Sequence, residues 1–168
     1  MKKLLVVPFL AAVIILIGCG GKTEIDKIAY NDKLVDLTEQ CFVHGEDAMR
    51  SSVELGDYQS AKAEFPRALE TCKQAHQNVG AVLPYNNDTD LKDAVAALLA
   101  AEIAYLETFE TILDFWMVED QLTPEQQEAL ATIEAELDTL EEAVNVASTN
   151  LMQTQETFAV KHGYELEE

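Results

Sequence analysis

Glycine and proline are scarce in this chain, with seven and four among 168 residues. Few positions can therefore support a tight turn or interrupt a helix. No segment sustains the alternation of β-branched and polar residues that is typical of strands. These absences exclude a fold rich in strands and turns, and they favour long helices with few connections.

Positive charge is also scarce, because 11 Lys and Arg stand against 31 Asp and Glu, which gives a net charge of −20 at pH 7. A field of that sign repels the phosphates of nucleic acids and of anionic lipid headgroups. The sequence therefore predicts no nucleic-acid partner. Most of the acidic residues are expected to form solvated helix faces.

The motifs of several enzyme classes are missing. There is no Cys-x-x-Cys-His for haem attachment, no glycine loop that would cradle a phosphate, and no serine in a nucleophile elbow. None of the three histidines follows a glutamate by three positions, as carboxylate-bridged di-iron bundles require. We therefore expect a protein that is not an enzyme and has no cofactor and no metal site.

The N-terminus has the pattern of a secretory signal. Lys2 and Lys3 precede an uncharged apolar run at residues 4–17. The run has 14 residues, fewer than the ~20 of a membrane-spanning helix, and it contains Pro8. No later apolar run approaches spanning length. The sequence therefore predicts a cleaved signal peptide at residues 1–18.

The end of this run, LIGC at residues 16–19, resembles the lipobox of bacterial lipoproteins. The resemblance implies that the thiol of Cys19 is acylated and that the chain is cut before it. Two or three acyl chains anchor a protein firmly, at ~0.8 kcal/mol for each buried methylene. Gly20 stands where an Asp would retain the protein at the inner membrane, so we expect the outer membrane, on either its periplasmic or its exterior face. The alternative, an ordinary signal peptide, would leave Cys19 as an unexplained exposed thiol.

After a tether at residues 19–24, apolar residues recur at spacings of three, four and seven, which predicts helices. The expected helices cover about 25–55, 58–82, 89–116 and 123–162. Gly56-Asp57 and the loop LPYNNDTD at residues 83–90 separate the first three. Thr123-Pro124-Glu125-Gln126 has the pattern of a capping box that opens the fourth.

Short connections make consecutive long helices antiparallel. The sequence therefore predicts an all-α fold, an antiparallel up-down four-helix bundle at residues 25–162, followed by an acidic tail at 163–168. Pro66 lies inside the second helix and is expected to kink it, because its ring removes a hydrogen-bond donor and clashes with the preceding turn.

Cys41 and Cys72 are equally distant from the turn at Gly56-Asp57, and both lie on or beside the apolar stripes of their helices. In an antiparallel hairpin they would be level, as a disulfide with a Cα separation of ~5.5 Å requires. An exported compartment is oxidising and permits the bond. We therefore predict a Cys41–Cys72 disulfide; the alternative is a pair of buried free thiols.

A zinc site from Cys41, His44, Cys72 and His76 is a second alternative. The two histidines diverge along the hairpin axis by about seven residues, or ~10 Å at the helical rise. Convergence of all four side chains on one ion would be strained.

Four segments of the mature chain resemble a family of small bacterial surface lipoproteins of unknown function. The segments are AYND with LV at residues 29–35, GDYQSAKAEFPRALE at 56–70, NNDTDLKDAVAALL at 86–99 and QETFAVKHGYELE at 155–167. The resemblance implies an all-helical fold and an envelope location. It implies no activity, no functional residues and no cysteine pairing.

These observations predict a lipid-anchored, non-catalytic lipoprotein of the cell envelope, with an interaction or structural role and an unidentified envelope protein as partner. The alternative is a module that binds a small ligand or a cation between its helices, near Tyr105, Trp116 and the small-residue start of the third helix. Core packing is the competing explanation for these aromatic residues.

Overall fold

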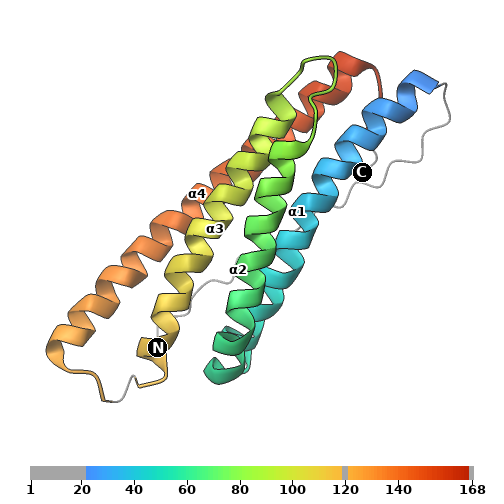
Figure 1. The fold of residues 1–168 in the computed structure, drawn as a ribbon. Coiled ribbons are helices and arrows are strands. Elements are labelled where there is room, and N and C mark those ends of the chain that lie inside the picture. The colour runs from blue at the N-terminus through green and yellow to red at the C-terminus, as the bar shows by residue number, and fades with distance from the viewer. Residues whose placement is uncertain (1–21, 119–120, 167–168) are drawn as a thin grey trace.

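The computed structural model describes residues 22–118 and 121–166, with the side chains of 22–26 and 44–53 left out. The described chain forms four helices, α1 (Lys22–Glu54), α2 (Tyr58–Ala81), α3 (Asp90–Trp116) and α4 (Pro124–His162). The helices run alternately up and down and pack against one another (Figure 1). The predicted all-α four-helix bundle is therefore confirmed. Because α1 begins at Lys22, the last three residues of the expected tether are helical.

The helix ends follow from local chemistry. Gly56 has φ 62° in the turn after α1, a left-handed conformation that glycine adopts without strain. The Asp57 carboxylate then accepts a hydrogen bond from the Ser60 N–H at the start of α2. At the start of α4, Thr123 and Gln126 form the predicted capping box. Gly163, with φ 69°, ends α4 in the left-handed conformation typical of a helix C-terminus.

The loop between α2 and α3 is a tight turn. The Asp88 N–H donates to the Tyr85 carbonyl at 2.8 Å, and Asn86 and Asn87 between them have φ of 50° and 63°. Asparagine tolerates positive φ better than most residues, which explains the Asn-Asn pair at this point. Thr89 is the N-cap of α3 but makes no side-chain cap hydrogen bond; the Asp88 carboxylate accepts from the Asp90 N–H instead.

The core lies along the axis of the bundle and contains side chains from all four helices. Phe65 of α2 stacks on Phe109 of α3, with ring centroids 5.3 Å apart and planes 11° apart. Burial of each such side chain stabilises the fold by about 1.5–3 kcal/mol. Other fully buried core residues are Leu34, Leu91, Leu99, Leu106, Ile112 and Leu113.

The helices do not all contact one another equally. Each helix packs closely along the next one in the chain, α1 on α2, α2 on α3 and α3 on α4. Helix α1 also contacts α3, less extensively. The contacts found between described residues of α1 and α4 lie near the start of α1 and the end of α4, where the Tyr30 and Phe158 rings pack 5.5 Å apart. The first half of α4 therefore packs chiefly on α3 (Figure 1).

Pro66 does not end α2, which is helical on both sides of it. A kink at this residue stays a prediction. No helix in the described part of the chain combines the length and the apolar character that crossing a membrane requires.

Candidate functional site

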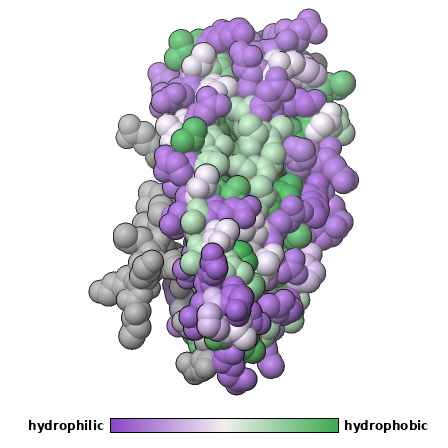
Figure 2. Space-filling view, turned by 90° about the vertical axis from the view of Figure 1, so that its left-hand side faces the viewer, coloured by the Kyte–Doolittle hydropathy of each residue, from purple (hydrophilic) through white to green (hydrophobic). Residues whose placement is uncertain are grey.

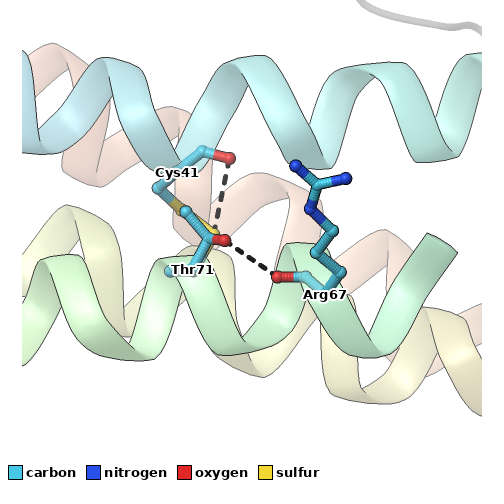
Figure 3. The surroundings of a disulfide bond; sticks show 4 residues. Cys41, Arg67 and Thr71 are labelled. Carbon is cyan, nitrogen blue, oxygen red and sulfur yellow. Dashed lines mark hydrogen bonds between the residues drawn. A yellow bond between two sulfur atoms is a disulfide. The ribbon is translucent and has the colours of Figure 1, made fainter.

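The two cysteines of the first hairpin lie at bonding distance. Cys41 in α1 and Cys72 in α2 have sulfur atoms 2.11 Å apart and Cα atoms 4.3 Å apart (Figure 3). Both residues are fully buried. The predicted pairing geometry is confirmed, because α1 and α2 run antiparallel from the Gly56 turn and keep the two cysteines level.

The surroundings of the disulfide are those of a structural crosslink. The Thr71 hydroxyl donates to the Arg67 carbonyl one turn earlier in α2, at 2.9 Å (Figure 3). Cys72 Sγ lies 3.4 Å from the Cys41 carbonyl oxygen. A disulfide sulfur has no hydrogen to donate, so this approach is a packing contact and not a hydrogen bond.

The residues of the alternative zinc site are not brought together as ligands. The sulfur atoms of Cys41 and Cys72 are joined to each other, and the His44 side chain lies outside the described part. His76 is half-buried on α2. Among the residues with described side chains, no group of three or more His, Cys, Asp or Glu is placed to hold a metal ion.

The predicted lipidation site, Cys19, lies outside the described residues, as does the predicted signal peptide. The described chain begins three residues later, at Lys22, the start of α1. The start of α1, the α2–α3 loop and the end of α4 lie at the same end of the bundle (Figure 1). The predicted lipidation site therefore precedes, by three residues in the sequence, a helix that starts at this end.

A cluster of charged side chains joins these three segments, and we call Lys27, Asp88, Lys161 and His162 the end cluster. Lys27 of α1 donates to the carbonyls of His162 and Gly163 at 2.6 and 3.1 Å, which satisfies acceptors at the C-terminus of α4. Asp88 of the loop contacts Lys161 at 2.8 Å and His162 Nε2 at 3.1 Å. The end cluster therefore links the start of α1 and the α2–α3 loop to the end of α4.

The Asp88 carboxylate is the centre of this cluster. Its side chain is 5% exposed, yet the hydrogen bond from Lys161 lowers its pKa below the usual value, and His162 acts in the same direction. A shallow depression beside it is lined by Asp88, Asp90, Asn150, Thr154, Phe158 and Lys161. Because Asp88 already pairs with two side chains, the cluster's chemistry is that of a structural ion pair.

The aromatic residues that the sequence offered as a possible ligand site form a packed row. The Trp116 ring lies 5.6 Å from both Phe109 and Tyr58, and Tyr105 lies 5.9 Å from Phe109. Edge and tilted contacts of this kind are the favoured geometries for aromatic pairs. Trp116 and most of this row therefore serve core packing between α2 and α3.

Glu102 is a feature that the sequence analysis did not single out. It is 3% exposed in the middle of α3, at the core spacing of four from both Leu98 and Leu106. Among the described residues, no hydrogen bond or ion pair reaches its carboxyl group. Burial raises its pKa from 4.5 to about 7. The sequence does indicate this burial, because Glu102 stands on the apolar stripe of its helix, between Leu98 and Leu106.

Tyr105 lies one turn further along α3 than Glu102, on the same face. Its pKa is raised above the usual value by burial first, and then by the negative charges of Glu141, Glu102 and Asp138. Asp138 and Glu141 belong to α4 and are also one turn apart. Burial and the neighbouring Asp138 likewise raise the pKa of Glu141. The carboxylates of α3 and α4 therefore both act on Tyr105, which lies on α3.

The lysines of this hairpin, Lys92 and Lys161, stand only near its two ends. Residues 93–160 include 15 Asp and Glu and no Lys, Arg or His. The described ion pairs that reach it come from α2, where Lys62 pairs with Asp114, and Lys73 with Glu107 at 2.7 Å. The face seen from the left of Figure 1 is accordingly hydrophilic over most of its area, with a pale apolar band (Figure 2). Exposed alanines on these helices are Ala97, Ala100, Ala129, Ala131, Ala135 and Ala143.

Comparison with protein-family models, with curated proteins and with solved structures finds no match for this chain.

Proposed function

We propose that the protein is a lipid-anchored lipoprotein of the bacterial cell envelope, acylated on Cys19 and held at the outer membrane, where its helical bundle binds an envelope protein partner without catalysis. The observation that carries the proposal is the sequence LIGC at residues 16–19, directly after a charged start and an apolar run of 14 residues. That run is too short to span a bilayer, whereas acyl chains on one cysteine anchor a protein without spanning.

Two features of the fold support this proposal. A bundle whose N-terminal helix starts three residues after Cys19 needs only a short link to a membrane surface. The buried Cys41–Cys72 pair suits an oxidising, exported compartment. The resemblance to small helical surface lipoproteins, drawn from the segments quoted above, points to the same location.

Replacement of the acylated residue tests the anchor. Cys19→Ser removes the thiol that carries the acyl chains, so the protein should leave the membrane fraction and be recovered in the soluble envelope fraction. Fractionation followed by immunoblotting measures this. Gly20→Asp is the matched control, because it keeps Cys19: it should stay membrane-bound and move from the outer to the inner membrane. Tight membrane association of the Cys19→Ser protein would contradict the proposal.

A further inference from the structure

The two most exposed large apolar side chains in the described part of the chain lie at one end of the bundle, and we call them the apolar tip. Leu83, in the loop between α2 and α3, is 85% exposed, and Val160, in the last turn of α4, is 83% exposed. This is the end at which α1 starts (Figure 1). Exposure alone does not indicate a partner, because Leu55, at the opposite end, is 75% exposed.

The position of the predicted acylated residue distinguishes the two ends. Cys19 precedes Lys22, the first residue of α1, by three positions. Three residues of fully extended chain span at most about 11 Å. Helix α2, which separates the two ends, has 24 residues and a length of about 36 Å. Acyl chains on Cys19 would therefore keep the end with the apolar tip at the bilayer surface, whereas Leu55 approaches that surface only if the bundle lies flat.

The link between Cys19 and α1 is long enough for the tip to reach the lipid. Lys27 contacts the end of α4, and the Tyr30 ring lies 6.1 Å from the Tyr85 ring of the loop. These two residues of α1 stand five and eight positions after Lys22, which is about 7–12 Å along the helix. A link of up to about 11 Å compensates for an offset of this size, because the acyl chains can enter the bilayer beside α1.

Backbone acceptors at this end are already satisfied, which lowers the cost of contact with lipid. The last carbonyl groups of a helix have no partner within the helix and are costly to remove from water. Lys92 donates to the carbonyls of Gly80 and Val82 at the end of α2, at 2.9 and 2.8 Å. Lys27 covers two carbonyls at the end of α4 in the same way, and Asp88 is paired within the end cluster.

We propose that the apolar tip docks on a bilayer of zwitterionic phospholipid, with Leu83 and Val160 at the boundary between headgroups and acyl chains. Anionic lipid is disfavoured, because the chain has a net charge of −20. The inference rests on the proposed lipid anchor, which supplies the affinity. The tip then supplies the orientation: the bundle stands on the membrane at the end where α1 starts, and the α1–α2 turn is the part farthest from the lipid.

Quenching of tryptophan fluorescence by brominated phosphatidylcholine measures this contact. The acylated full chain, purified from membranes in detergent, is reconstituted into phosphatidylcholine vesicles with and without bromine on the acyl chains. Trp116→Phe removes the single tryptophan, and Leu83→Trp or Val160→Trp then places a reporter at the tip. Leu55→Trp in the same background is the matched control, because it places the reporter at a similarly exposed position of the opposite end. Circular dichroism verifies that each variant folds.

Bromine should decrease the emission of each tip reporter by about half or more, because a side chain at the boundary lies ~5–10 Å deep. The emission of Leu55→Trp should decrease by less than about a tenth, because the length of α2, about 36 Å, separates it from the tip. Flotation of the same vesicles tests the anchor separately. If the protein floats and either tip reporter is quenched no more than the control, the inference is overturned and the anchor stands. Protein that does not float contradicts the anchor and, with it, the inference.

Discussion

The α1–α2 hairpin and the α3–α4 hairpin both bury apolar stripes, but different forces hold them. The first is crosslinked by Cys41 and Cys72 and contains seven basic and 11 acidic residues at positions 22–81. The second has no crosslink, and its positions 90–162 contain 16 acidic residues and two basic ones, Lys92 and Lys161, near its ends. It also buries Glu102 without a partner among described residues.

The α1–α2 half of the bundle is therefore fixed by a covalent bond. The α3–α4 half is held together by apolar packing, which must outweigh the repulsion between its negative charges. Like charges on neighbouring helices repel each other and destabilise the fold. The fold also loses stability when a buried carboxyl group ionises. The α3–α4 hairpin is therefore expected to respond to pH, salt and cations, whereas the α1–α2 hairpin is expected to respond to redox conditions. The stability of each hairpin can therefore be changed by conditions to which the other is not expected to respond.

Loss of the crosslink should have the largest effect. The Cys41→Ala/Cys72→Ala double variant removes a bond between residues 31 apart in sequence, and the chain-entropy relation gives a decrease of about 4 kcal/mol in the free energy of unfolding. Denaturant unfolding followed by circular dichroism measures it. A reducing agent should destabilise the original protein similarly and leave the double variant unchanged. Equal stability of oxidised protein and double variant would show that the bond does not fix this hairpin.

The pH response of Glu102 should be nearly as large. Its folded pKa of about 7 exceeds its ordinary value of 4.5, so the folded state keeps a proton that the unfolded state loses. The stability linked to Glu102 is therefore complete below pH 4.5 and decreases as pH rises to about 7. The total decrease is about 3 kcal/mol, at 1.36 kcal/mol per pKa unit.

Unfolding measured at intervals from pH 4.5 to pH 8 detects this change, and Glu102→Gln is the decisive variant. The free energy of unfolding of this variant should not show the decrease with pH that is assigned to Glu102. At pH 8 it should exceed that of the original protein. Glu136→Gln, which changes an exposed carboxyl of the same hairpin, should retain the slope. Identical slopes in the original and Glu102→Gln proteins would refute the assignment.

The ion pairs that join the two hairpins should contribute least. Lys73 and Glu107 lie 2.7 Å apart, but their side chains are 41% and 51% exposed, so water and salt screen the attraction. A double-mutant cycle with Lys73→Ala and Glu107→Ala should give a coupling free energy below about 0.5 kcal/mol. The coupling should disappear in high salt. A value well above 1 kcal/mol would mean that the hairpins are joined by charge as well as by their shared core.

The sequence predicted the helices, their ends and the disulfide, because these features follow from local sequence patterns and from the register of one hairpin. The 3.6-residue spacing of apolar residues, the capping box at Thr123 and the turn at Gly56 define the helices, and equal distance from that turn pairs Cys41 with Cys72. These features depend on residues close in sequence, or on two helices joined by one short turn.

The features that the sequence did not reveal depend on contacts between distant segments. Asp88 pairs with Lys161 and His162, which are more than 70 positions away, and nothing local marks them as partners. Glu102 is one glutamate among many, and only its burial by neighbouring helices distinguishes it from a surface residue. The sparse contact between α1 and the first half of α4 likewise reflects how the hairpins assemble.

The most direct test of the lipid anchor is mass spectrometry of the first tryptic peptide of protein extracted from membranes. Cleavage after Lys22 should release Cys-Gly-Gly-Lys, residues 19–22, with a diacylglyceryl thioether on the cysteine and no residue before it. A peptide that begins at Leu4 and still contains the apolar run, or one in which Cys19 is an unmodified thiol, would contradict the account.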